Sequence, residues 1–486
     1  MDAFDSENMH EGDGINNAGT WYGMTMKKWT PVIIATVLAA LAAAIPSQGA
    51  ETGWEAGAAS IVITPEQPMY LEGYVPAKIA SEKVHDVYAK ALALSDPAGN
   101  RVVIVTADLI GYDYGFTAGI AEEVKKKFGL PREAILFNAS HTHSGPAIFP
   151  AEWQRIYGYT PEEVEKVTAY IGWARERFVR VIGDALSGMK PAVVSFAKAQ
   201  PVPFAMSRRF PTETGISYRS TPATQYPGGA RDDTVPVLRV SSPDGKVRAV
   251  LFGYACHPIT MSFDKFCGDY PGFAQRYIEE AYPEAVALFM QGCGGELVPN
   301  ARYQIEYAMG HGRALFDAVK SAIEGPQTPV TGPLACAYTE TTLNLQPAPD
   351  RKTLEEQAKS DNAVIRNKAA FLLETLDKNG KIESSIRCPL QAIRFGKELL
   401  LVGISGETVV EYAAALKSEN LTQFTWVAGY CNYVYAYLPT WRILKEGGYE
   451  GGEAIRYTPF SGPFLDDVET RVLAGAREVV KKVSER

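Results

Sequence analysis

The fold is indicated most clearly by residues 101–140, RVVIVTADLIGYDYGFTAGIAEEVKKKFGLPREAILFNAS. Two short apolar runs in it, at 101–110 and 134–140, are bounded by turn residues, as is typical of buried strands. Between them, residues 119–129 have charges at i, i+4 spacing opposite an apolar stripe, which predicts an amphipathic helix. The stretch therefore predicts a strand, a helix and a second strand.

The same alternation extends along the chain in both directions. We predict further strands at 87–96, 235–242, 249–257 and 285–293, a hairpin of 389–396 with 398–405, and helices at 162–186, at 466–483 and as two segments within 354–380. With 486 residues, 46% of them apolar, the chain can bury a large core. We expect an α/β fold, with a mixed β-sheet core covered by helices in a single domain and the functional site where strands end.

The overall charge excludes one class of partner. A formal net charge of −8 provides no basic field for a phosphate backbone, so we expect no nucleic-acid partner.

The six cysteines contain no CxxC pair, which argues against a cysteine-based metal site, and they are too few for a disulfide scaffold of this size.

The N-terminal segment has the pattern of an export signal. Lys27 and Lys28 precede the apolar run WTPVIIATVLAALAAAIP and a small-residue exit at 47–50. We interpret residues 1–23 as a polar leader, 24–50 as a secretory signal peptide and 51–486 as the functional domain of a secreted or periplasmic protein. A retained membrane anchor is the alternative, although the run is shorter than the roughly 20 residues that a spanning helix needs.

Three of the predicted strands run directly into polar residues suited to chemistry. Residues 134–140 lead into His141-Thr142-His143, residues 249–256 into His257, and residues 398–405 into Gly406-Glu407. Histidines at i and i+2 of an extended segment project to the same face. Two imidazoles and a carboxylate are good zinc ligands, and a catalytic zinc keeps one position open for water. Taken alone, each piece has a plainer interpretation as a surface or core residue.

A serine hydrolase using Ser140 or Ser144 is a weaker alternative. The glycine that precedes the serine in a GxSxG elbow is missing from HTHSGPA, so the local sequence does not support a strained nucleophile turn.

A set of motifs then resembles a known family. NASHTHSGP, GYACHPITM, GDYPGFA, GELVPN, ISGET and CNYVYAY occur in the order found in the catalytic domain of the neutral (non-lysosomal) ceramidases and their bacterial relatives. The resemblance runs from AGAASIVITP near Ala56 to the final helix. We expect a single catalytic domain without the additional C-terminal β-rich domain that the family carries.

The resemblance implies roles for individual residues. The zinc ligands would be His141, His257, Glu407 and Tyr437, with Tyr435 as the competing tyrosine. It makes His143 a catalytic proton-transfer group rather than a ligand, although the residues alone also allow both histidines to bind metal. Arg208 and Tyr449 would stabilise an oxyanion; the plainer interpretation of Arg208 is a surface charge beside Arg209.

One departure from the family bears on the substrate. The position that carries an active-site serine in the ceramidases holds Val298, which cannot attack or donate a hydrogen bond. Because all four metal ligands are kept, we expect attack by zinc-activated water. Cys293 is interpreted as a small buried residue rather than a substitute nucleophile.

We therefore expect an exported zinc-dependent hydrolase that cleaves an amide bond of a lipid or another N-acyl compound. The alternatives are a metallo-esterase or deacetylase acting on a sugar or other small metabolite, and a non-catalytic binding protein on the same scaffold. Aromatic residues that could line its pocket are Tyr70, Tyr74, Phe149, Trp153 and those of the TQYPGG segment at 224–229.

Overall fold

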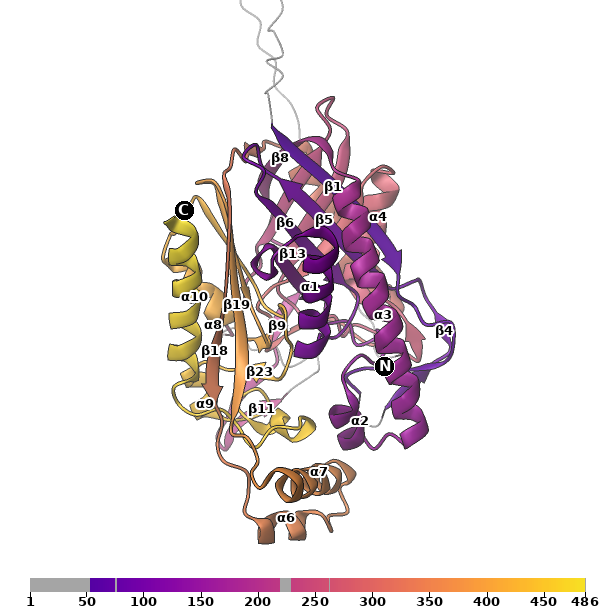
Figure 1. Ribbon diagram of the computed structural model, residues 1–486, viewed down its shortest axis with the longest axis vertical. Coiled ribbons are helices and arrows are strands. Elements are labelled where there is room, and N and C mark those ends of the chain that lie inside the picture. Colours follow the sequence, from indigo (N-terminus) through magenta and orange to yellow (C-terminus); the bar gives the residue numbers. More distant parts are fainter. Residues whose placement is uncertain (1–52, 75–76, 219–228, 262, 486) are drawn as a thin grey trace, which may run out of the picture. The chain divides into compact units, whose positions relative to one another are not determined.

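The computed structural model describes residues 53–74, 77–218, 229–261 and 263–485 (Figure 1). Its larger sheet follows the order β15 (Val286–Gln291), β13 (Val247–Tyr254), β12 (Val235–Ser241), β8 (Lys190–Ala199), β1 (Trp54–Val62), β5 (Tyr88–Ser95), β6 (Arg101–Ala107), β7 (Ile135–Ala139). The short β17 (Thr328–Pro329) also pairs with β8. The β13–β15 and β6–β7 pairs are parallel and the others antiparallel, so the sheet is mixed, as predicted.

A second sheet lies against the first. Its order is β18 (Leu334–Asn344), β19 (Ser385–Phe395), β20 (Leu399–Ile404), β22 (Phe424–Ala428), with β20 and β22 parallel. Side chains of both sheets share one buried core, in which Leu92 and Ile104 of the larger sheet join Ile393, Leu401 and Trp426 of the smaller one. The two sheets are therefore packed face to face.

Helices cover the outer faces of this pair of sheets (Figure 1). The larger sheet is covered by α1 (Tyr114–Phe128), α3 (Pro161–Ser187), α4 (Asp269–Ala281) and α5 (Ile305–Glu324), and the smaller by α8 (Val410–Ser418) and α10 (Val468–Ser484). The order of layers is helix, sheet, sheet, helix. The prediction of a mixed sheet core covered by helices is confirmed, and its division between two sheets is a finding of the structure.

Shorter elements complete the chain. Paired strands are β2 (Met69–Leu71) with β3 (Lys78–Ala80), β4 (Glu82–Lys83) with β14 (Lys265–Phe266), β9 (Ala205–Ser207) with β16 (Leu297–Pro299), β10 (Arg209–Thr212) with β11 (Gly215–Tyr218), and β21 (Glu407–Thr408) with β23 (Tyr437–Leu438). The remaining helices are α2 (Ala151–Tyr157), α6 (Arg351–Gln357), α7 (Ala363–Asn379) and α9 (Trp441–Glu446), with 3-10 turns at Arg132–Ala134 and Glu453–Tyr457.

The apolar runs form strands because both faces of the sheet are covered. In β6, Val103 and Val105 face the helices, whereas Val102 and Ile104 face the second sheet. A strand buried on both faces needs apolar residues at every position, which is why these segments lack polar alternation. Helix α3 begins where the sequence supplies a capping box: the Thr160 side chain accepts from the Glu163 N–H, and Pro161 is the first helical residue.

Four of the longer strands were not among the predicted elements: β1, β8, β18 and β22. The sequences of three of them explain why. WEAGAASIV in β1 is rich in alanine and glycine, β8 contains Pro191, and β18 carries polar residues along LACAYTETTLN. These three strands are specified by their neighbours in the sheets rather than by local β-propensity, whereas β22, FTWVA, is rich in strand-forming residues.

Several sequence predictions fall outside this description. The leader at 1–23, the signal peptide at 24–50 and most of the TQYPGG segment lie outside the described residues. Among the residues that the structure describes, no helix is long and apolar enough to cross a membrane. No disulfide joins any two of the six cysteines, all of which belong to the described part of the chain.

A buried asparagine joins the strand ends that carry the predicted site. The Asn138 side chain, at the end of β7, accepts from the Gln291 N–H at 2.8 Å and donates to the Gly429 carbonyl at 2.8 Å. It thereby connects β7 to the end of β15 and to the turn after β22. Because a buried amide group must be hydrogen-bonded, these bonds hold the ends of the two sheets together.

Candidate metal centre and active site

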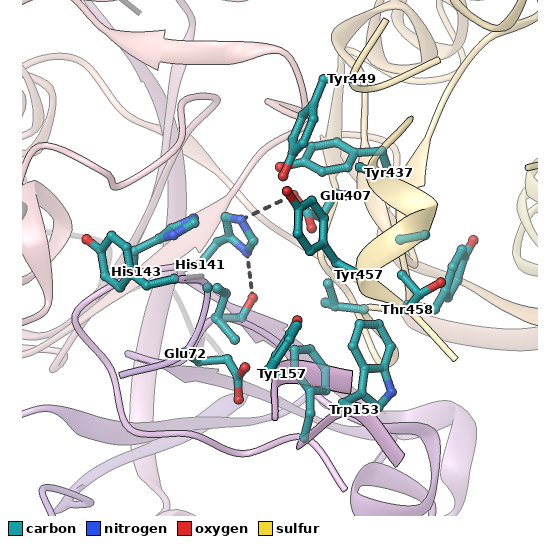
Figure 2. Close-up of a pocket in the computed structure, with 18 residues that line it drawn as sticks. Glu72, His141, His143, Trp153, Tyr157, Glu407, Tyr437, Tyr449, Tyr457 and Thr458 are labelled. Carbon is teal, nitrogen blue, oxygen red and sulfur yellow. Dashed lines mark hydrogen bonds and ion pairs between the residues drawn. The ribbon is translucent and has the colours of Figure 1, made fainter. Parts of the chain in front are cut away.

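Four predicted metal ligands that are far apart in the sequence meet at one point, and Figure 2 shows three of them, His141, Glu407 and Tyr437. The Glu407 Oε2 atom lies 3.2 Å from Nε2 of His141 and 3.4 Å from Nε2 of His257. The Tyr437 hydroxyl lies 3.3 Å from the same His257 nitrogen. Both histidines are fully buried. The structure thus brings together the two imidazoles, the carboxylate and the phenol.

The backbone fixes which nitrogen of His141 faces the cluster. Its Nδ1 lies 2.6 Å from the Ile110 carbonyl oxygen, and since a carbonyl can only accept, Nδ1 carries the proton. The lone pair of Nε2 therefore points at Glu407. The expectation of an extended His-x-His segment is wrong: β7 ends at Ala139 and His141 has a left-handed backbone, φ 67°. A turn, rather than strand periodicity, aims its ring.

His257 is oriented in the same way. Its Nδ1 lies 2.8 Å from the Gly294 carbonyl and 3.1 Å from the Leu297 carbonyl, so it is again the donor and Nε2 is free to bind. Burial, assisted by the positive charge of Arg208, lowers the pKa of His257 to about 4. The ring is therefore neutral at pH 7, which is the form that binds metals.

Strand pairing places the other two groups side by side. Glu407 and Tyr437 are direct register partners in the parallel β21–β23 pair. Burial raises the pKa of Glu407, but the adjacent His141 and His257 more than offset this and hold it well below its ordinary value. Tyr435, the competing tyrosine, packs instead against Phe464 in the core, with 6.3 Å between ring centroids. Tyr437 is therefore the tyrosine at the cluster.

The donor set fits a divalent cation. Nε2 of His141 and Oε2 of Glu407 are buried and have no hydrogen-bond partner in the described structure, although they face each other. Buried polar atoms of this kind are costly unless something binds them, and imidazole, carboxylate and phenolate are suitable ligands for zinc. Nitrogen atoms of His141, His143 and His257 also lie within 4.8 Å of one another, so a set with three histidines remains the alternative.

His143 lies beside the cluster but, unlike His141 and His257, its ring has no hydrogen bond to a backbone carbonyl among the described residues. Its ring centroid is 5.0 Å from that of His141, and neither of its ring nitrogens has a hydrogen-bond partner among the described residues. Burial, with the neighbouring His141 and His257, lowers its pKa well below the ordinary value. A neutral imidazole with unoccupied nitrogens beside a metal site can accept a proton.

Arg208 is buried, which excludes the interpretation as a surface charge. Its Nε donates to Glu450 Oε1 at 2.6 Å and its Nη2 to the Gly295 carbonyl at 2.9 Å. The guanidinium carbon lies 5.2 Å from the ring centroid of Tyr437 and 5.5 Å from that of Tyr449. Burial raises the pKa of Tyr437 well above its ordinary value, and the positive charge of Arg208 opposes this rise only in part. Arg208 thus makes cation–π contacts with the rings of both tyrosines.

Glu450 positions Arg208, and neutralising the Glu450 carboxylate should destabilise the protein measurably. It also accepts from Arg209 Nη1 at 3.0 Å, and both arginines are at least nine-tenths buried. We expect Glu450→Gln to lower the free energy of unfolding by about 3–5 kcal/mol, because the buried Arg208 guanidinium loses the carboxylate beside it and Arg209 retains Glu446 but loses the more buried of its two carboxylates. Urea denaturation at pH 7 measures the loss.

The matched control is Glu374→Gln at an exposed pair. Arg155 and Glu374 lie 2.6 Å apart with about half of each side chain exposed, so the same substitution should cost less than about 1 kcal/mol. Equal losses in the two variants would contradict a structural role for the buried network.

A cavity of about 300 Å³ opens beside the cluster (Figure 2). Its described lining comprises Glu72, Gly73, Tyr74, Ile110, His141, His143, Phe149, Trp153, Tyr157, Glu407, Val434, Tyr435, Ala436, Tyr437, Tyr449, Ala454, Tyr457 and Thr458. Tyr74, Phe149 and Trp153 line it as expected. Tyr70 does not: its ring stacks on Tyr159 and its hydroxyl donates to Glu163. Tyr449 lines the cavity, whereas Arg208 lies outside this set.

Sequence reasoning missed four polar residues of the described lining: Glu72, Tyr157, Tyr457 and Thr458. Glu72 is buried, and burial raises its pKa to about 7 against the lowering effect of backbone N–H groups. Tyr157 lies across from it, and its pKa is raised by burial and then by the charge of Glu72. The available signal for Glu72 was a single carboxylate within the apolar run MYLEGY, which by itself is a weak one.

The candidate nucleophiles Ser140, Ser144 and Cys293, and Val298 at the position of the family's serine, are not among the described residues that line the cavity. Val298 is fully buried in β16, opposite Met206 of β9, and Cys293 is fully buried, as interpreted from the sequence. Burial raises the pKa of the Cys293 thiol. Ser140 and Ser144 are also outside the described lining of the cavity. A serine or cysteine nucleophile is therefore not supported by the geometry.

Comparison with known proteins agrees with the motifs. A family model described as neutral/alkaline non-lysosomal ceramidase, N-terminal, matches residues 56–311. Neutral ceramidase of Drosophila melanogaster is 22% identical over 218 residues, which are 43% of this chain and 30% of that protein's length. The chain thus spans about a third of the length of this curated relative.

Two solved structures have the same fold. The crystal structure of neutral ceramidase from Pseudomonas aeruginosa superposes with a TM-score of 0.66 at 18% identity, covering 88% of this chain and 74% of that one. A structure of ceramidase complexed with C2 gives a TM-score of 0.65 at 18% identity and the same coverage. Since the family model covers more than half of the sequence, the chain belongs to the neutral/alkaline non-lysosomal ceramidase family.

Proposed function

We propose that this chain is a metal-dependent hydrolase that cleaves a linear N-acyl amide bond, with Zn²⁺ as its metal. The supporting observation is the meeting of the His141 and His257 Nε2 atoms at one carboxylate oxygen of Glu407, with the Tyr437 hydroxyl beside them. This donor set borders a cavity large enough for a small ligand. The family membership supports hydrolysis of an amide.

The residues divide the work by position. His141, His257, Glu407 and Tyr437 would hold the metal, which when bound supplies a Lewis acid for the carbonyl and for water. His143 accepts a proton from the attacking water at a ring nitrogen and donates it to the leaving amine. Tyr449 donates a hydrogen bond to the developing oxyanion, and Arg208 supports Tyr449 and Tyr437 by its charge behind their rings.

We further propose that the protein is exported. The support is the sequence at 24–50, where two lysines, an apolar run and small residues follow one another. Expression of the full chain in a bacterial host tests this: N-terminal sequencing of the periplasmic or secreted protein should begin near residue 50. A product confined to the cytoplasm with residues 24–50 intact would contradict export.

A second candidate is a metallo-esterase or deacetylase acting on a small polar metabolite. The observation that favours this candidate is Glu72, a buried carboxyl group in the cavity wall. A purely aliphatic acyl chain would offer no hydrogen-bond donor to this carboxyl group. Val298, in place of the serine expected from the family, also leaves ceramide itself in question as the substrate.

A substrate panel combined with metal removal tests the proposal. The panel holds a long-chain N-acylsphingosine, short N-acyl amines, acetylated amino sugars and matched esters. Chelation should reduce turnover of the accepted substrate by more than about 100-fold, since a Lewis acid contributes several kcal/mol, and Zn²⁺ should restore it. Full activity of the metal-free protein would contradict metal dependence. Stoichiometric metal without turnover across the panel would instead support a binding protein.

The same metal removal should lower the melting temperature. A metal that binds only the folded state at a free concentration 1,000 times its dissociation constant stabilises by about 4 kcal/mol. Differential scanning calorimetry of the protein with and without Zn²⁺ measures the shift. Identical transitions would show that the four side chains do not form a binding site.

A further inference from the structure

A second carboxyl group, Glu72, is built into the cavity wall. It follows β2, and only 2% of its surface is exposed. The backbone ties it down at two points: the Glu72 N–H donates to the Gly145 carbonyl at 3.2 Å, and its Oε2 accepts from the Ile148 N–H at 3.2 Å. Both partners belong to the loop that follows His143. The position of Glu72 is therefore coupled to the position of the predicted catalytic histidine.

Glu72 has no cationic partner among the described residues. Glu450 faces two guanidiniums, whereas the ion pairs of the described residues include none to Glu72. The described lining of the cavity contains no lysine or arginine. A carboxyl group offers four lone pairs, and the backbone N–H groups of Ile148, Phe149 and Gly73 occupy at most three of them, which leaves acceptor capacity in the cavity wall.

The backbone next to Glu72 lies against the predicted catalytic histidine. A Cβ at Gly73, the next residue, would lie 2.6 Å from Nδ1 of His143, so this backbone rests directly on the histidine ring. In the view of Figure 2 the Glu72 carboxyl and Glu407 lie on opposite sides of His141, and the Tyr157 ring is beside the Glu72 carboxyl. Because Glu72 lines the same cavity as His141, Glu407 and Tyr437, a molecule that fills the cavity contacts both Glu72 and the proposed metal site.

We propose that Glu72 is a specificity-determining residue that accepts a hydrogen bond from a hydroxyl or ammonium group of the substrate. The inference rests on the proposed amide hydrolysis and names the part of the substrate that this chain recognises: a donor group a short distance from the scissile amide. When a ligand without a hydrogen-bond donor fills the cavity and displaces water, it leaves the acceptor unpaired. The cost of that unpaired acceptor weakens the binding of such a ligand.

Three probes that differ in one terminal group test this. They are the hexanoyl amides of ethanolamine, ethylenediamine and propylamine, which end in a hydroxyl, an ammonium and a methyl group. A second pair, 6-hydroxyhexanoyl and hexanoyl propylamide, places the donor on the acyl side. We expect kcat/KM to be at least about tenfold higher for a donor-bearing probe than for its methyl counterpart, the value of one net hydrogen bond.

Two variants assign the preference to Glu72. Glu72→Met has similar volume and no acceptor, and it should reduce the ratio between donor and methyl probes to below about twofold. Glu72→Gln keeps an acceptor oxygen but no charge, so it should retain part of the ratio for a hydroxyl and lose it for an ammonium. Both variants should keep their full metal content, because Glu72 is outside the proposed ligand set.

Each outcome bears on one of the two proposals. A wild-type ratio near one, or an unchanged ratio in Glu72→Met, would overturn the inference while amide hydrolysis stands. If the wild type hydrolyses neither these probes nor any amide of the substrate panel, the proposed function fails, and the inference is then judged from the affinities of the same probes by calorimetry. The same tenfold preference, lost in Glu72→Met, would support it, and equal affinities would overturn it.

Discussion

Replacing Glu407 by alanine is expected to remove the metal and to lower turnover by about 10³-fold or more, because a bound Lewis acid contributes several kcal/mol. Glu407 is the only carboxylate among the four grouped side chains, and its Oε2 lies within 3.4 Å of both histidine Nε2 atoms. Without it, two neutral imidazoles and a phenol would have to hold a doubly charged ion. Metal content by mass spectrometry and kcat/KM on the accepted substrate are measured together.

The control for this prediction is Glu411→Gln. Glu411 lies four residues further along, on α8, and pairs with Arg442 near the surface. This variant should keep its metal and its activity. Glu407→Ala with stoichiometric zinc and wild-type turnover would contradict the assignment of the ligand set.

Replacing His143 by alanine is expected to leave the metal in place and to lower kcat by about 10²–10⁴-fold, the range that general acid–base catalysis contributes. The reason is its position: the ring lies beside His141, yet neither of its nitrogens is held by a backbone carbonyl as those of His141 and His257 are. KM should change little, and added imidazole should restore part of the activity.

This variant also separates the two possible ligand sets. If His143→Ala loses metal as fully as Glu407→Ala does, His143 is a ligand, as the grouping of three histidines within 4.8 Å permits. If it keeps the metal and loses turnover, the proton-transfer role is supported. Wild-type turnover in His143→Ala would contradict both roles.

The sequence predicted the fold where burial on both faces left a strong local signal. Strands such as β6 and β7 are continuous apolar runs because helices cover one face and the second sheet covers the other. The pairing of two sheets was not predictable. Most residues of β18 are only partly buried and several are polar, and its partner β19 follows in the sequence only after helices α6 and α7. Non-local contacts of this kind leave no periodicity in the sequence.

The site was predictable as a set of residues but not as a geometry. Residues at strand ends, together with the family resemblance, identified His141, His257 and Glu407. The choice between Tyr435 and Tyr437 required the register of β21 against β23, which turns one ring into the core and the other to the cluster. Arg208 could not be distinguished from a surface charge because its partner, Glu450, is 242 residues away. Glu72 was missed for the same reason: its environment is made by a loop far along the chain.

The most direct test of the metal site is X-ray diffraction from crystals grown with Zn²⁺, recorded on both sides of the zinc absorption edge. The account predicts a single strong anomalous peak bonded to Nε2 of His141, Nε2 of His257, a carboxylate oxygen of Glu407 and the hydroxyl of Tyr437, at about 2.0–2.2 Å from each atom. The peak should border the cavity that contains Glu72. Crystals in which these four side chains surround no anomalous density at saturating zinc would contradict it.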